Sequence, residues 1–152
     1  MSSTRALLRW QFRLGHALLD AALDRPDPPA AAGAWYARAV VGEDLSISVL
    51  AAQAPLALST WRARTGLSEL PPLATSADWR SWARRVRVDL GQLRRYRSAV
   101  YAATDTYVAG LTEDALDPAH AESTVCLLSA LLLTMAVRRG QIACLAPAVA
   151  SR

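Results

Sequence analysis

The chain has 152 residues, of which 53% are apolar, and this suffices for the core of one ordinary domain and no more. All 17 basic residues are arginine, and the formal net charge is +4. This arginine bias fits a GC-rich bacterial genome, so the charge alone does not indicate a nucleic acid partner. The abundance of Ala, Leu and Arg in the periodic stretches predicts a single all-α domain over residues 1–152.

The first predicted element is a helix over residues 4–24. Its apolar stripe includes Leu7, Trp10 and Leu14, which recur at helical intervals of three or four residues. The segment "RPDPP" ends this helix, because proline cannot continue it. A loop is expected to follow, up to about residue 43.

A second helix is expected to begin at Asp44 or Ser46, since either side chain can cap a helix N-terminus. It runs to about residue 64, where Gly66 stops it. The segment "SELPPLATS" then reads as a linker.

Two further helices complete the predicted set. Ser76 is the expected N-cap of a third helix over 77–109, which Gly110 closes. A fourth helix spans 123–145 and ends before Pro147. Helices of this length bury their apolar stripes against each other, so we predict a four-helix bundle whose long connections help to wall a pocket.

An arginine-rich stretch lies within the predicted third helix. Acidic residues such as Asp78 and Asp89 are interspersed in it, so we expect a solvated helix face and neither a nucleic acid nor a membrane partner. The arginines are Arg84, Arg85, Arg87, Arg94, Arg95 and Arg97.

Cysteine usage and apolar run length favour a cytoplasmic protein. Cys126 and Cys144 lie in one helix, too far apart to pair with each other, and are expected to be buried free thiols. The apolar run over 125–137 is too short to span a bilayer. The N-terminus lacks the order of a signal peptide, because Arg9 and Arg13 interrupt it.

Three motifs resemble those of a known superfamily. They are "LLRWQFRLGHALLDAAL" in the first helix, "EDLSISVLAAQAPLALSTW" in the second and "RRGQIACL" at the end of the fourth. Their order resembles the DinB-like superfamily, whose four-helix bundles include bacterial thiol transferases and the mycothiol-dependent maleylpyruvate isomerase. The resemblance implies a DinB-like bundle and a possible homodimer.

Members of this superfamily typically hold a metal with one histidine on the second helix and two on the fourth. Alignment on Gly140, Gln141 and Ile142 places the two fourth-helix positions at Thr134 and Arg138. Alignment on the Ser-Ile pair of the second helix places the remaining position at Gln53. A guanidinium offers no lone pair to a metal, so we predict a site with no metal and no cofactor.

The resemblance implies that Gln53, Thr134 and Arg138 converge as catalytic groups. A buried Arg138 needs an acidic partner such as Asp89 or Asp105, a set of backbone carbonyls, an anionic ligand, or a route to a surface carboxylate at the bundle mouth. These alternatives stay open at the level of sequence.

Aromatic and polar residues complete the candidate site. Trp35 and Tyr36 fall in a predicted loop, where they are expected to form a lid over the pocket. His16 is either part of the site or an ordinary core histidine. The candidate substrate-binding residues are His16, Trp35, Tyr36, Trp61, Tyr101 and Gln141.

The sequence contains no phosphate-binding glycine loop, nucleophile elbow or Cys-X-X-Cys pair. We therefore expect a metal-independent enzyme of actinobacterial specialised metabolism, which cyclises, isomerises or rearranges a largely apolar small-molecule substrate with a polar or anionic group near Arg138. One alternative is a non-catalytic small-molecule-binding or interaction protein. Another is a mycothiol-dependent S-transferase.

Overall fold

The computed structural model of the chain describes residues 3–24, 31–54, 58–72, 78–117, 119 and 122–145. Its elements are α1 (Thr4–Leu23), α2 (Ala32–Leu50), α3 (Leu58–Thr65), α4 (Trp79–Arg85), α5 (Leu90–Ala109), the 3-10 turn η1 (Asp114–Leu116) and α6 (Glu122–Cys144). The only β-type pairing in these ranges is an isolated bridge between Leu67 and Val88. The prediction of an all-α protein is confirmed.

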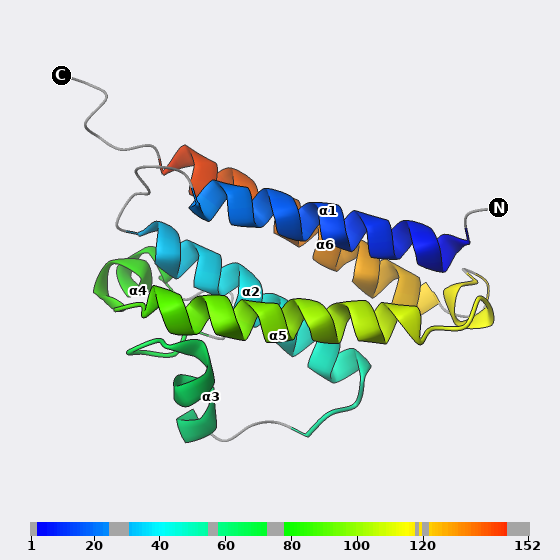
Figure 1. Ribbon diagram of the computed structural model, residues 1–152, viewed down its shortest axis with the longest axis horizontal. Helices are drawn as coiled ribbons and strands as arrows, with labels where there is room; N and C mark the ends of the chain where they lie inside the picture. The colour runs from blue at the N-terminus through cyan, green and yellow to red at the C-terminus, as the bar shows by residue number, and fades with distance from the viewer. Residues whose placement is uncertain are drawn as a thin grey trace.

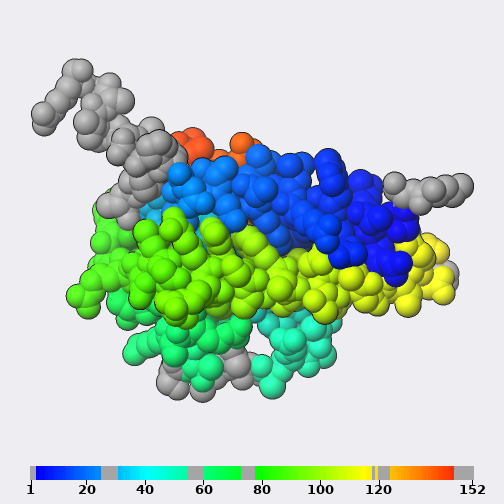
Figure 2. Space-filling view, in the orientation of Figure 1, coloured from blue at the N-terminus to red at the C-terminus, as the bar shows by residue number. Residues whose placement is uncertain are grey.

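The long helices α1, α2, α5 and α6 lie side by side (Figure 1). Both α1 and α2 pack against α5 on one side and α6 on the other. The short α3 packs against α5, and α4 contacts α2. In the space-filling view α1 and α5 lie next to each other on one face (Figure 2). Because α1 and α2 also contact each other, each long helix has at least two long neighbours, which cover its apolar stripe.

Apolar side chains gather in two clusters between these helices. One is centred on Tyr36, Trp82 and Leu93, which join α2, α4 and α5. The other includes Phe12 of α1 and Leu128 of α6. All five of these side chains are at most 2% exposed, so their burial is a main source of stability.

The second helix begins earlier and ends earlier than predicted. Residues 32–43, expected in a loop, form the first part of α2, and the helix ends at Leu50. Tyr36, Val40 and Ile47 are buried along it at spacings of four and seven residues, which place them on one helix face.

The predicted third helix is interrupted. Asp78 caps α4 by accepting hydrogen bonds from the backbone N–H of Arg80 and Ser81, and Asp89 caps α5. Between these helices the Asp89 N–H donates to the Gly66 carbonyl at 2.9 Å. This long-range pairing replaces helical hydrogen bonds over 86–89. Ser76, the predicted cap, lies outside the described residues.

Gly66 follows α3 with a φ of 70°, in the left-handed region that favours glycine. A Cβ there would also lie 2.8 Å from Gln92 Cβ. The prediction that a helix ends just before Gly66 is confirmed, although this helix, α3, is a short separate element.

The first and fourth predicted helices match α1 and α6 within a residue or two. Cys126 and Cys144 are free but exposed, so the prediction that they are buried is wrong. The inner side of α6 is formed by other residues, including Leu128, Met135 and Ile142. By length and composition alone, Thr124–Cys144 is long and apolar enough to cross a membrane. This stretch is longer than the apolar run over 125–137 that the sequence analysis considered too short. Of its most apolar window, 22% is buried. One such helix is weak evidence of a membrane span, because the core helix of a soluble protein passes the same test, although such a helix is mostly buried and this window is not.

The arginine-rich stretch is divided between α4, α5 and the segment joining them. Five of its six arginines are exposed, and Arg97 is partly buried. Arg85 pairs with Glu69 at 2.7 Å and Arg94 with Asp24 at 2.8 Å. These contacts are those of a mostly solvated surface with local ion pairs.

Candidate functional site

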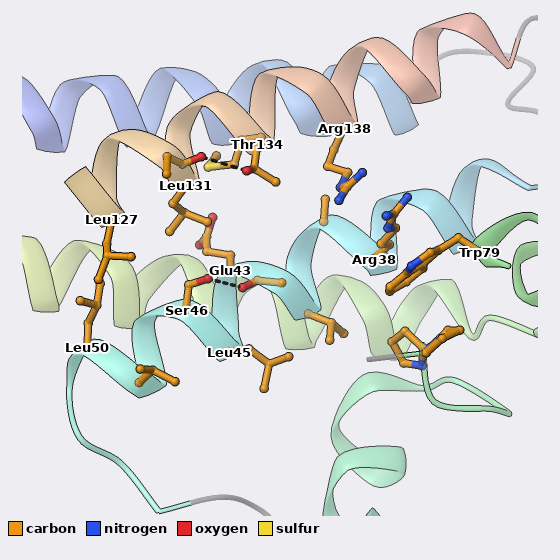
Figure 3. Close-up of a pocket in the computed structure, with 18 residues that line it drawn as sticks. Arg38, Glu43, Leu45, Ser46, Leu50, Trp79, Leu127, Leu131, Thr134 and Arg138 are labelled. Carbon is orange, nitrogen blue, oxygen red and sulfur yellow. Dashed lines mark hydrogen bonds between the residues drawn. The ribbon is translucent and has the colours of Figure 1, made fainter. Parts of the chain in front are cut away.

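A groove lies between α2 and α6, with a volume of about 490 Å³ (Figure 3). Trp79 of α4 and the pair Pro71 and Pro72 contribute to its wall. Leu50 and Leu127 lie toward the other end in the close-up. This volume is in the range of small-molecule sites.

The groove contains two of the three predicted catalytic residues. Thr134 and Arg138, four residues apart on α6, both line it. The Thr134 hydroxyl donates to the Ala130 carbonyl at 2.9 Å. Gln53 does not belong to the groove. Because α2 ends at Leu50, Gln53 lies beyond the helix and is exposed, so its predicted convergence with the other two is wrong.

Arg138 is half-buried and has no carboxylate partner among the described residues. Its Nη1 donates to Gln141 Oε1 at 3.0 Å. Asp105 instead pairs with Arg9 of α1 at 2.8 Å, and Asp89 is engaged as the cap of α5. Neither acidic partner suggested by the sequence is therefore used by Arg138.

Arg38 of α2 also lines the groove, and the sequence analysis missed it. Its guanidinium carbon lies 3.9 Å from the centre of the Trp79 ring and 5.2 Å from that of Trp35. The close-up shows its guanidinium directed toward Arg138 (Figure 3). Burial, and then the charge of Arg138, lower the pKa of Arg38 to about 10, and burial lowers that of Arg138.

A second polar region lies between α1, α2 and α5. His16 Nε2 is 2.8 Å from Glu43 Oε1, and the Thr104 hydroxyl donates to Glu43 Oε2 at 2.8 Å. All three residues are buried, and Glu43 is only 1% exposed. Glu43 is also part of the groove wall, so this buried region and the groove share one residue.

A tyrosine pair continues this polar region. The Tyr101 ring stacks on His16 with centroids 3.6 Å apart and planes inclined by 8°. The hydroxyls of Tyr36 and Tyr101 donate to Asp20 Oδ1 at 2.5 and 2.8 Å. Arg97 lies 3.3 Å from the same carboxylate. Burial is the main cause that raises the pKa of both tyrosines. Together these residues (His16, Asp20, Tyr36, Glu43, Arg97, Tyr101 and Thr104) form the buried polar cluster.

The structure thus divides the predicted substrate-binding residues among different places. His16, Tyr36 and Tyr101 meet in the buried polar cluster. His16 is buried, as a core histidine would be, but its partner Glu43 also lines the groove, so its burial does not exclude a part in the site. Gln141 contacts Arg138. The lid prediction is wrong, because Trp35 and Tyr36 lie in α2, and Tyr36 is fully buried.

Trp61 lies apart from the groove lining. It is in α3, partly buried, and packs against the apolar cluster around Tyr36, Trp82 and Leu93. Its position is that of a core-supporting aromatic.

Helical spacing is the signal that would have found Glu43, one of the residues that the sequence analysis missed. Once α2 is extended back to Ala32, Tyr36, Val40, Glu43 and Ile47 lie on one face. A carboxylate on such an apolar face requires a buried partner. His16 and Asp20 are likewise one turn apart on α1.

No group of three or more His, Cys, Asp or Glu side chains in the described ranges is arranged to hold a metal ion. The chain's other histidine, His120, lies outside those ranges.

No family model matches the chain, and neither a curated protein nor a solved structure matches it. The DinB-like resemblance therefore stays a prediction from short motifs.

Proposed function

We propose that the protein is a metal-independent enzyme that isomerises, cyclises or rearranges a small, largely apolar molecule in the α2/α6 groove of a DinB-like four-helix bundle. The mutual packing of α1, α2, α5 and α6 supports the scaffold part of the proposal. The same positions on α6, Thr134 and Arg138, that the motif alignment selects also line the groove.

The observation that carries the proposal is the composition of the groove wall. Apolar side chains from both helices, such as Leu45, Leu131 and Met135, occur there together with the buried carboxylate of Glu43. Pockets that combine apolar walls with a few placed polar groups are typical small-molecule sites.

Glu43 and His16 supply the acid–base chemistry in this proposal. A carboxylate hydrogen-bonded to an imidazole takes up or releases one proton without a large change in position. An isomerisation by proton transfer needs one proton to leave one atom of the substrate and one to be delivered to another, which an acid–base pair can do. Thr104, which donates to Glu43, fixes the orientation of the carboxylate.

The charges of the groove support metal-independent chemistry. Arg38 and Arg138 both line it, and Glu43 is the only acidic residue among the described lining residues. Two guanidiniums repel a cation and cannot ligate one.

A second candidate function is ligand binding without catalysis. Both oxygens of Glu43 already have hydrogen-bonding partners in the protein, His16 and Thr104. A carboxylate that is fully satisfied by the fold has a structural role without any contribution to a reaction.

Incubation of the purified protein with a bacterial metabolite extract tests the two candidates. Isomerisation, ring closure by isomerisation and rearrangement conserve the molecular formula, so mass spectrometry after chromatography should reveal a product with unchanged mass and altered retention. Glu43→Gln should abolish this conversion, while exposed Arg139→Met on α6 should not. A compound that binds and is recovered unchanged supports pure binding, and the absence of both results contradicts the proposed function.

A further inference from the structure

The groove contains two uncompensated positive charges close to one end of its wall. Arg38 makes no hydrogen bond to any described residue, and its Nε is buried without a partner. Among the described residues, Arg138 donates only to the neutral side chain of Gln141. The described residues place no carboxylate within ion-pair distance of either guanidinium.

The structure nevertheless holds these charges in place. The Arg38 guanidinium lies against the face of Trp79, and its central carbon is 5.2 Å from the centre of the Trp35 ring. An aromatic face attracts a cation and fixes its plane, but it leaves the N–H groups without acceptors. Gln141 fixes Arg138 in a similar way through one N–H.

Charges held without acceptors are costly to bury, and the lowered pKa values of both arginines express that cost. A bound anion removes the cost, since each guanidinium offers a planar fork that matches the oxygens of a carboxylate or a phosphate.

The remainder of the groove is mostly apolar, and its other polar lining residues are Glu43, Ser46 and Thr134. Along α6 the lining runs from Arg138 to Leu127, which corresponds to about 16 Å at the rise of an α-helix. Val49 and Leu50 continue the apolar wall on α2. The groove therefore has its two positive charges near one end and a mostly apolar lining along the rest of its length, in which Glu43 is engaged by His16 and Thr104.

We propose that Arg38 and Arg138 form an anion subsite that binds the oxyanion head of an amphipathic small molecule, whose apolar body lies along the α2/α6 groove. The shared chemistry of the head is a carboxylate or a phosphate. This assignment rests on the proposed function, because it takes the groove as the place where the ligand binds, and it adds the chemical class of that ligand.

Isothermal titration calorimetry with three matched probes tests the subsite. Decanoate carries a carboxylate, decyl phosphate carries a phosphate, and decan-1-ol carries the same chain without a charge. Each is titrated below its micelle concentration. We expect one or both anions to bind roughly ten- to a hundredfold more tightly than the alcohol, the effect of a charged hydrogen bond in a partly dry site. The preferred anion distinguishes the two heads.

Four variants locate the binding. Arg38→Met and Arg138→Met should each remove the preference for the anion and leave alcohol binding unchanged. Arg139→Met, at the exposed neighbouring position, should bind like the unaltered protein. Ala130→Trp, which fills the groove from its α6 side, should abolish binding of all three probes.

The outcomes separate the two levels of the proposal. Equal binding of alcohol and anions, or anion binding that survives both arginine changes, overturns the anion subsite and leaves the groove as a binding site. Failure of all three probes to bind, or binding that persists in Ala130→Trp, contradicts the groove as the ligand site and the anion subsite with it.

Discussion

The buried polar cluster and the α2/α6 groove differ in the pairing of their charged groups. In the buried polar cluster, Glu43 has two partners and Asp20 has three, the hydroxyls of two tyrosines and the guanidinium of Arg97. In the groove, Arg38 and Arg138 face the same space without a carboxylate between them. Both regions are formed by α2 and its neighbours, so the difference lies in pairing and not in location.

This difference distinguishes charged groups that stabilise the fold from charged groups that are available to bind a ligand. A satisfied buried pair stabilises one arrangement of helices, since loss of either partner leaves an orphaned polar group. Two like charges without a described carboxylate partner repel each other, so in Arg38 only the contact with Trp79 and Trp35 offsets that cost. The difference predicts that variants of the two regions change stability in opposite directions.

The largest effect is expected for Glu43→Ala. It removes the acceptor of both His16 and Thr104 in a place that is 1% exposed, so the free energy of unfolding should fall by about 3–5 kcal/mol. Urea denaturation followed by circular dichroism measures the change. Glu43→Gln is the control and should lose less, because its amide oxygen still accepts one hydrogen bond. An alanine variant as stable as the unaltered protein would show that the pair contributes nothing.

Alkaline pH should affect the two regions with opposite sign. Burial raises the pKa values of Tyr36 and Tyr101 above their usual 10.0, so above about pH 10 the folded state holds protons that the unfolded state releases. Stability should then fall by about 1.4 kcal/mol per pH unit for each tyrosine. Arg38, with its pKa lowered from 12.5 to about 10, is protonated more strongly when unfolded, so its contribution rises over that interval.

Denaturation at about pH 9 and about pH 11 measures both contributions. Tyr101→Phe should weaken the alkaline loss of stability, and Arg38→Met should steepen it. If the two variants changed the slope in the same direction, the opposite roles of the two regions would be refuted.

Tyr101→Phe should also have a moderate effect at neutral pH. The change deletes the hydroxyl that donates to Asp20 and keeps the ring that stacks on His16, which corresponds to about 1–2 kcal/mol of lost stability. Tyr107→Phe is the matched control on the same helix, since the hydroxyl of Tyr107 makes no hydrogen bond to a described residue. Equal losses in both variants would argue against a specific role of the Asp20 contact.

The smallest effect is expected for Arg138→Met. Since no described carboxylate pairs with Arg138, its removal relieves repulsion with Arg38 and should leave stability unchanged or raise it by up to about 1 kcal/mol. Thermal unfolding in the absence of ligand measures this. A loss of several kcal/mol would instead identify Arg138 as part of the satisfied framework.

The sequence predicts α1 and α6 well because their apolar stripes are long and uninterrupted. It fails for α2, where proline and a run of alanines at 28–32 suggested a loop, although Tyr36, Val40 and Ile47 continue a buried face. It fails again at 86–89, where pairing with residues 66–68 ends one helix and starts another. Contacts between segments about twenty residues apart override local helix propensity there.

For the candidate site, the motif alignment that follows from the DinB-like resemblance placed Thr134 and Arg138 in one pocket. Both line the groove, as residues four apart on one helix face can. Gln53 was misplaced because the assumed helix frame continued past the actual end of α2 at Leu50. Arg38 and Glu43 were missed for the related reason that they fell in a predicted loop or at its edge. The wrong start of the predicted second helix therefore kept Arg38 and Glu43, the most informative charged residues, out of the candidate site.

Cys126 and Cys144 are both free and exposed, so each end of the groove can be labelled at a native thiol without introducing a new cysteine. Cys126 precedes Leu127 at the apolar end, and Cys144 lies beyond Arg138 on the same helix. The two cysteines are about 27 Å apart along the helix axis. A polarity-sensitive dye attached to one thiol or the other, with the second replaced by serine, would report from opposite ends of the groove. The two emission shifts together would reveal in which direction a bound molecule is oriented.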